Sequence, residues 1–551
     1  MRNLSRAAAL VTAGALFTSA AMAQFGLRSG SWNTAGADAQ RTAWARADPS
    51  ISLARMPEFQ FLWKVKVDNT AKGGYSLSQA VTVDGYVGYR GFRSYAFVGG
   101  ASNAAIALDF DIGRVEWTQT LGSSTSAGTA QCPGGMTAGV TRPVTLAPAP
   151  AGSGAQGGRG GRGGAAATGS VGEPDAGAPA LALARPAGRG APPPGPLAAR
   201  GPRPVPNPLN SGIFALATDG KLRTLYISNG KDIKPPMQFL PADANATGLI
   251  LVDNVVYAAT RGNCGGAPNG VWAMDISAPT PTPLHWSTNG GSVVGTVGPA
   301  FGTDATIYAA TGDGDYTPAA FSDSLVALES KTLRLKDWFT PGKSEFTSSP
   351  VVFPFKQGDK ERDLIAVANK DGHLYLLDSA SLGGADHKTP LARSAAFATS
   401  VAGALASWEV DGQRWILASA TAALNASASL PATNGSVSNG AVVAFKVVDQ
   451  GGKLSLQPGW VSRDLTTPLP PIVVNGLVFA LAGGTAAKPA VLYALDGKTG
   501  KELWNSGTTI AGQVLPTGGM AESASQLYLA TADSTIYAFG IPIVPPALAA
   551  K

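Results

Sequence analysis

The 551-residue chain has few of the side chains on which most enzyme sites depend. Only 14% of its residues are charged, and it contains two cysteines and three histidines. The histidines, His285, His373 and His387, show no metal-ligand spacing. The sequence has no C-x-x-C-H haem attachment, no G-x-S-x-G elbow and no G-x-x-x-x-G-K-[ST] loop. These absences argue against an attached haem, an α/β-hydrolase and a P-loop nucleotidase.

Apolar runs long enough to span a membrane are missing as well. Arg2 and Arg6 precede a short apolar run that ends at the A-x-A sequence Ala21-Met-Ala23. This order predicts a secretory signal peptide over residues 1–23, cut near Ala23–Gln24. The run is shorter than the ~20 residues that cross a bilayer, and no run of that length follows it. We expect a soluble mature protein without a transmembrane segment, either periplasmic or secreted.

The net charge of +6 does not predict a nucleic-acid-binding surface. Two arginines lie in the signal peptide, and most of the remaining excess lies in residues 146–206, so the rest of the chain is about neutral. Residues 146–206 are rich in Gly, Ala, Pro and Arg and have almost no large apolar side chains, which predicts a disordered insert. Its Arg-Gly-Gly repeats resemble RNA-binding segments. In an exported chain, however, a flexible loop is the expectation.

What the sequence does contain is a strand-and-turn repeat. Its clearest copy places the apolar strand Leu492–Leu495 before the turn Asp496–Gly500 and ends on Trp504. Copies recur about every 50 residues once the insert is removed, and most have Ala at the third place. The eight aligned copies are 105–109, 213–217, 271–275, 325–329, 374–378, 442–446, 492–496 and 536–540.

A period near 50 residues with strand-type units predicts a β-propeller with four strands in each blade. The eighth copy ends at Gly540 without a following strand, whereas Phe61–Val67 resembles a fourth strand without its first three. Pairing of the two would close the ring and remove an exposed sheet edge. We therefore expect an all-β, eight-bladed propeller of antiparallel four-stranded blades over residues 24–145 and 207–551, closed by the N-terminal strand. Seven blades is the alternative if the copy at 213–217 is not a repeat.

The segment Ala494–Trp504 resembles the tryptophan-docking repeat of the pyrroloquinoline quinone (PQQ) β-propellers. The entry segment Trp32–Gln40 is similar to the opening of many such proteins. The likeness covers nearly the whole mature chain outside the insert. This superfamily includes quinoprotein alcohol dehydrogenases and non-enzymatic members such as an outer-membrane-assembly lipoprotein, so the resemblance implies the fold and leaves the activity open.

Two sets of acidic residues are candidates for chemistry. Asp313 and Asp315 alternate with glycines in a loop of the type that ligates Ca²⁺, although Asp-Gly pairs also form ordinary β-turns. By resemblance to the quinoprotein dehydrogenases, Asp323 stands at the position of their proposed catalytic base, with Ser324 where that family has Asn. The adjacent Cys-Cys pair of those enzymes is missing. Residues that would bind PQQ do not follow from the sequence.

The two cysteines, Cys132 and Cys264, both lie in Gly-rich loops. Connections between blades and loops within blades share one face of a propeller, and an oxidising compartment favours a bond. We expect a disulfide between them, with two separate thiols as the alternative.

Two functions fit this sequence. The first is an exported, non-catalytic binding or scaffold protein, expected to be a monomer, that binds an unknown protein or small molecule at its loop-bearing face or central channel. The second is a PQQ- and Ca²⁺-dependent dehydrogenase that oxidises an alcohol or sugar, with Asp323 as base. The lack of an intact active-site motif favours the first function, and the resemblance supports the second.

Overall fold

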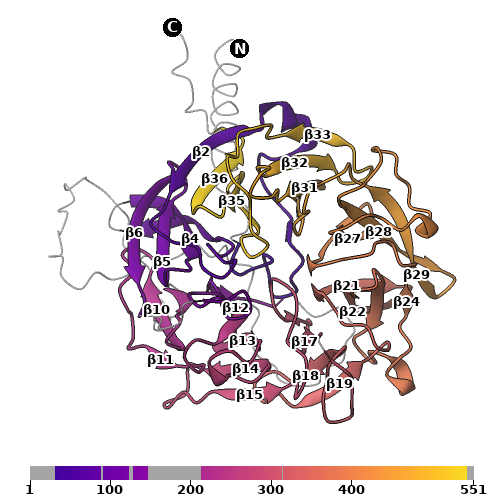
Figure 1. The fold of residues 1–551 in the computed structure, drawn as a ribbon, viewed down its shortest axis with the longest axis horizontal. Coiled ribbons are helices and arrows are strands. Elements are labelled where there is room, and N and C mark those ends of the chain that lie inside the picture. Colours follow the sequence, from indigo (N-terminus) through magenta and orange to yellow (C-terminus); the bar gives the residue numbers. More distant parts are fainter. Residues whose placement is uncertain (1–31, 89–90, 123–127, 147–211, 313, 543–551) are drawn as a thin grey trace, which may run out of the picture.

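The computed structural model describes residues 32–88, 91–122, 128–146, 212–312 and 314–542. This part of the chain is almost entirely β-structure, and its sheets form a ring around a central axis (Figure 1). The predicted signal peptide and nearly all of the predicted insert lie outside the described residues. Within the described residues, no helix has the length and apolar character needed to cross a bilayer.

Eight four-stranded antiparallel sheets form the blades, which we number in chain order. From the inner strand outward, blade 1 contains β3 (Val81–Gly88), β4 (Gly91–Gly99), β5 (Ala104–Asp109) and β6 (Arg114–Thr120). Blade 2 contains β7 (Val140–Thr141), β9 (Gly212–Leu216), β10 (Lys221–Tyr226) and β11 (Met237–Gln238). Blade 3 contains β12 (Asn245–Val252), β13 (Val255–Arg261), β14 (Gly270–Asp275) and β15 (Leu284–Ser287). Blade 4 contains β16 (Ala300–Phe301), β17 (Ile307–Ala310), β18 (Leu325–Leu328) and β19 (Leu335–Phe339).

The second half of the ring follows the same order. Blade 5 contains β21 (Val351–Gln357), β22 (Lys360–Ala368), β23 (Leu374–Asp378) and β24 (Ala392–Arg393). Blade 6 contains β26 (Ala406–Val410), β27 (Gln413–Ala420), β28 (Ala441–Gln450) and β29 (Lys453–Val461). Blade 7 contains β30 (Ile472–Val474), β31 (Leu477–Ala482), β32 (Val491–Asp496) and β33 (Glu502–Asn505). Blade 8 contains β34 (Met520–Ser523), β35 (Gln526–Ala530), β36 (Thr535–Gly540) and β2 (Gln60–Lys66).

Short parallel pairs and 3₁₀ turns complete the described elements. β1 (Trp44–Ala45) pairs with β30, β8 (Pro143–Val144) with β12, and β20 (Ser348–Ser349) with β25 (Gly403–Ala404). The 3₁₀ turns are η1 (Leu53–Glu58), η3 (Cys264–Gly266), η4 (Gly384–Asp386) and η5 (Ala426–Ala428).

The ring closes as the sequence predicts. β2 pairs antiparallel with β36, with Gln60 opposite Gly540 and Lys66 opposite Thr535. Figure 1 shows β2 (indigo) beside β36 (yellow), so the two ends of the propeller share one blade. Eight blades are confirmed and the seven-bladed alternative is excluded.

The repeat alignment places one copy on a second strand instead of on the third strand of its blade. Residues 213–217 fall on β9, the second strand of blade 2, whereas every other copy falls on a third strand. The third strand is β10, and the turn after it brings Gly230 under the ring of Trp117. Both strands of this hairpin are buried, so apolar patterning does not distinguish them.

Tryptophans on the outer strands pack against the neighbouring blades, as the repeat predicts. In three blades an indole Nε1 donates to a backbone carbonyl in the turn that follows the third strand of the next blade. The indole ring packs over a glycine of that turn. At Gly500, whose φ is +70°, an added Cβ would approach the Trp460 ring to 2.3 Å, which explains why the turn requires glycine. The three Nε1-to-O distances are 2.9 Å for Trp63 to Phe110, 2.8 Å for Trp117 to Ile227 and 2.8 Å for Trp460 to Gly497.

The segment from Trp32 to Asp48 contacts all eight blades along the ring's inner edge. Its backbone carbonyls accept hydrogen bonds from inner-strand amides, from Thr82 in blade 1 to Val473 in blade 7. Thr34 Oγ1 donates to the Leu249 carbonyl in blade 3, and Asp48 accepts from Ser525 in blade 8. Most of these contacts are backbone bonds that any sequence can make, so side-chain patterning did not reveal them.

Arg41 anchors this segment from within the ring. Its side chain is 1% exposed and donates to the carbonyls of Ala35 (2.5 Å), Gly248 (3.0 Å) and Pro299 (2.9 Å) and to Thr34 Oγ1 (2.9 Å). Burial lowers the pKa of this guanidinium to about 9, because desolvation disfavours the charged form.

A buried carboxyl lies where the N-terminal segment meets blade 8. Glu522 on β34 is fully buried, and burial raises its pKa well above the usual 4.5, with the nearby Asp48 carboxylate adding to the rise. Asp48 itself accepts hydrogen bonds from Ile51 N (2.6 Å) and from Ser525 N (2.8 Å). Glu522 therefore holds its proton in the folded protein to a higher pH than in the unfolded chain.

We expect Glu522→Gln to stabilise the protein increasingly as the pH rises. Because the folded-state pKa is raised, the contribution of Glu522 to the free energy of unfolding is complete below about pH 4.5. This contribution declines as the pH rises through the folded-state pKa. The neutral amide removes this decline. Chemical denaturation at several pH values should show a free-energy difference between variant and wild type that grows with pH. Glu361→Gln, on an exposed side chain, is the matched control, and parallel curves for Glu522→Gln and wild type would contradict the expectation.

Candidate functional site

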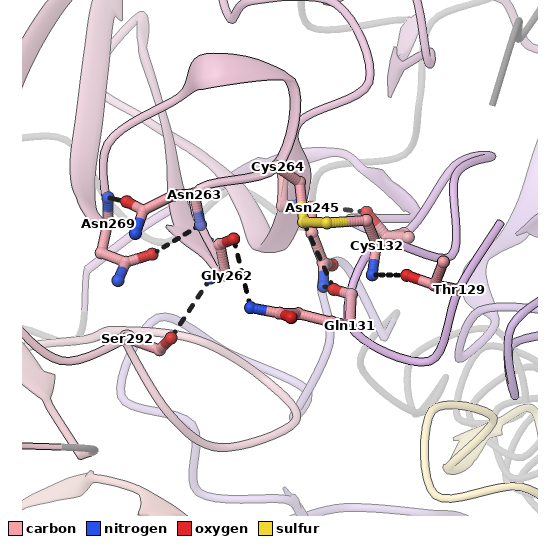
Figure 2. The surroundings of a disulfide bond; sticks show 11 residues. Thr129, Gln131, Cys132, Asn245, Gly262, Asn263, Cys264, Asn269 and Ser292 are labelled. Atoms are coloured by element: carbon pink, nitrogen blue, oxygen red, sulfur yellow. Dashed lines mark hydrogen bonds between the residues drawn. A yellow bond between two sulfur atoms is a disulfide. The ribbon is translucent and has the colours of Figure 1, made fainter.

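Connections that lead into the blades and loops between second and third strands open on one face of the ring, which we call the loop face. Cys132 lies in the connection from blade 1 to blade 2, and Cys264 lies in the loop between β13 and β14 of blade 3. The two form a disulfide with a Cα–Cα distance of 5.6 Å (Figure 2). The predicted disulfide is confirmed, and it joins segments that are 132 residues apart.

Beside the disulfide lies a pocket of about 450 Å³. Its walls come from connections around the ring's mouth and from the ends of two blade 3 strands, including Tyr75, Gln131, Asn245, Arg261, Ser292 and Thr517. Because inner strands of a propeller converge on the axis, loops from blades far apart in sequence meet at this pocket. A volume of this size is typical of a small-molecule site.

Arg261, the last residue of β13, gives this pocket its charge. Its guanidinium has no hydrogen bond or ion pair with any of the described residues. Burial lowers its pKa from 12.5, and no carboxylate offsets that effect. Among the described residues that line the pocket, none is Asp or Glu. We call this site the arginine pocket.

Uncharged hydrogen-bonding groups surround the guanidinium. Asn245 donates through Nδ2 to the Gln131 carbonyl at 2.7 Å, and Gly262 N donates to Ser292 Oγ at 3.2 Å (Figure 2). Because Ser292 Oγ accepts this bond, its hydroxyl proton remains to be donated within the pocket that Arg261 lines. Such a set suits an anion, because a guanidinium and a hydroxyl line one pocket without a competing carboxylate.

The acidic candidates lie elsewhere on the loop face. Asp323 is 5% exposed, has a φ of +50° and lines a separate pocket of about 490 Å³ with Lys343, Glu345, Lys370 and others. Asp315 is exposed and forms a 3.3 Å ion pair with Lys343, while Asp313 lies outside the described residues. Lys343 thus pairs with Asp315 and lines the same pocket as Asp323, and neither aspartate lines the arginine pocket.

These side chains fit PQQ and Ca²⁺ unequally. The carboxylates of PQQ match the charge of Arg261. Ca²⁺ requires six to eight oxygen ligands, usually with carboxylates among them, and the arginine pocket supplies a cation in their place. Near Asp323, the carboxylate of Glu345 is paired with Lys370 at 2.7 Å. No group of three or more His, Cys, Asp or Glu that fits a metal ion occurs in the described part of the chain. The combined PQQ and Ca²⁺ site does not fit the described residues.

Sequence reasoning did not identify Arg261. The sequence feature that could have indicated this residue is its position between a buried strand and the Gly-rich loop that carries Cys264. Whether an arginine has a carboxylate partner is a tertiary property, so the sequence did not show that this one is unpaired.

Comparison with known proteins shows that the fold of this chain is similar to that of several solved structures. No protein-family model matches the chain, and no curated protein matches it. The quinohemoprotein alcohol dehydrogenase of Comamonas testosteroni is 14% identical with a TM-score of 0.55, covering 94% of this chain and 81% of that one. The quinohemoprotein alcohol dehydrogenase of Pseudomonas putida HK5 is 13% identical with a TM-score of 0.57, again covering 94% and 81%. A europium-containing methanol dehydrogenase is 12% identical with a TM-score of 0.57, covering 93% and 98%.

Proposed function

We propose that this chain, which has the β-propeller fold of the quinoprotein alcohol dehydrogenases, is an exported, non-catalytic binding protein that holds a small anion in the arginine pocket. The observation that carries the proposal is the guanidinium of Arg261, which has no partner among the described residues and lines a pocket of about 450 Å³. A partly buried charge without a partner is costly, and a bound anion would offset that cost with charge-assisted hydrogen bonds.

Two features support the binding function over catalysis. A general base must lie within about 2.6–3.2 Å of the proton that it removes, and Asp323 lines a different pocket from Arg261. An arginine stays protonated and serves for binding rather than proton transfer. The disulfide and the signal peptide predicted over residues 1–23 support export.

A melting experiment with chosen ligands tests this proposal. Citrate and inorganic phosphate are expected to raise the melting temperature saturably, since a ligand at 100 times its Kd stabilises the fold by about 2.7 kcal/mol. Glucose, an uncharged control, is expected to have no effect. No anion-dependent shift would contradict the proposal.

PQQ with and without Ca²⁺ separates the two functions. PQQ alone is expected to bind as an anion, Ca²⁺ is expected to add little, and added ethanol or methanol is expected to give no dye reduction. Saturable, Ca²⁺-dependent dye reduction would establish the dehydrogenase and overturn the non-catalytic function.

A further inference from the structure

The disulfide joins two segments that line the arginine pocket. Gln131, next to Cys132, lines the pocket on one side, and Arg261 and Gly262, just before Cys264, line it on the other. The bond therefore joins the two walls directly (Figure 2). Any change in this bond acts at the pocket.

The wall from blade 3 is braced without the disulfide. Asn263 and Asn269 exchange two hydrogen bonds of 3.1 Å between backbone N–H groups and side-chain oxygens. Asn269 Nδ2 also donates to the Gly290 carbonyl at 3.0 Å, and Gly262 N donates to Ser292 Oγ. Figure 2 shows the asparagine pair and Ser292 on the Gly262 side of the bond. This wall should keep its shape when the bond is broken.

The wall around Gln131 is a short exposed turn. Thr129, Ala130 and Gln131 are exposed, and the turn is closed on itself by Cys132 N donating to Thr129 Oγ1. Besides the disulfide, it is tied to blade 3 by Asn245 Nδ2 to the Gln131 carbonyl (2.7 Å) and by Gln131 Nε2 to the Gly262 carbonyl (3.4 Å). The chain becomes anchored again at Gly135, whose N–H donates to Thr218 Oγ1. The disulfide is thus the covalent tie between residues 129–132 and blade 3.

We propose that the Cys132–Cys264 bond is a redox control of the arginine pocket: the disulfide form holds the Gln131 wall in place for binding, and the dithiol form releases it and weakens binding. The inference rests on the anion-binding function proposed above. Ordering the freed wall each time a ligand binds should weaken affinity about tenfold, since immobilising even one side chain carries a measurable cost.

The redox step needs a dithiol as reductant. Cys132 is partly exposed and Cys264 is 3% exposed, so a thiolate attacks the sulfur of Cys132 and expels the Cys264 thiolate, which takes up a proton. The second thiol of the reductant then attacks the mixed disulfide and releases Cys132 as a thiol. Two electrons and two protons pass to the protein, and the reductant becomes a disulfide. The reverse reaction uses a low-molecular-weight disulfide as oxidant.

Citrate binding measured by calorimetry tests the control. Full-length mature protein is compared in oxidised form and after dithiothreitol, and the Cys132→Ser/Cys264→Ser variant serves as a reductant-free mimic. Citrate affinity is expected to fall about tenfold in both altered forms, while each still melts cooperatively. Hydrogen exchange should accelerate in residues 128–134 and remain unchanged in residues 262–269.

The outcomes separate this inference from the proposed function. Binding by oxidised protein with unchanged affinity after reduction would overturn the redox control alone. A lack of citrate binding by oxidised protein would overturn both. Loss of cooperative melting on reduction would show that the bond maintains the fold rather than the pocket, which also overturns the control.

Discussion

A chain that lacks residues 32–66 is expected to lose cooperative folding. This segment supplies the outer strand of blade 8 and contacts all eight blades along the inner edge. Trp32, Ile51, Met56 and Phe59 are each at most 4% exposed, and burying four such side chains contributes about 6–12 kcal/mol. A domain's net free energy of unfolding is about 5–15 kcal/mol. The burial energy lost with this segment is therefore comparable to the entire stability of the domain.

Circular dichroism melting of the truncated chain checks this prediction. Deletion of residues 150–206 is the matched control, because the sequence predicts that this insert contributes nothing to the ring. The control is expected to melt like the full chain. A truncated chain with a cooperative transition near that of wild type would show that the ring does not depend on its N-terminal closure.

Arg261→Met is expected to weaken anion binding strongly while leaving the ligand-free fold at least as stable as before. Hydrogen bonds to a charged group are worth about 1.5–3 kcal/mol, which corresponds to roughly a 10-fold to 150-fold loss in affinity. The guanidinium has no partner among the described residues, so its removal breaks no contact there. The methionine keeps an apolar stem of similar length.

Calorimetric titration with citrate and a thermal melt without ligand check both halves of this prediction. Arg334→Met is the matched control, because Arg334 is 75% exposed and pairs with Glu329 in the turn before β19. It should bind citrate like wild type. If Arg261→Met retained wild-type affinity, or if it lost stability in the absence of ligand, Arg261 would be a structural residue rather than a binding residue.

The features that repeat along the chain were predictable from sequence. The strand-and-turn repeat gave the number of blades, because each unit buries both faces of its third strand. The unpaired strand at Phe61–Val67 and the missing strand after Gly540 gave the closure, since each supplies what the other lacks. The pairing of Cys132 with Cys264 followed from two loop-borne cysteines and a fold that gathers loops on one face.

The features that depend on tertiary context were not predictable. β9 and β10 are both buried, so the repeat alignment chose the wrong strand in blade 2. The N-terminal segment follows the inner edge through backbone hydrogen bonds that leave no side-chain pattern. Resemblance drew attention to Asp323, but the pocket beside the disulfide is defined by Arg261, whose lack of a partner appears only once the blades are assembled.

A crystal structure of the oxidised protein with citrate, at a concentration that saturates binding in calorimetry, tests the central claim most directly. We predict density for citrate in the arginine pocket, with a carboxylate accepting hydrogen bonds from the guanidinium of Arg261. Citrate bound instead beside Lys343 and Lys370, with the arginine pocket holding only water, would contradict the account.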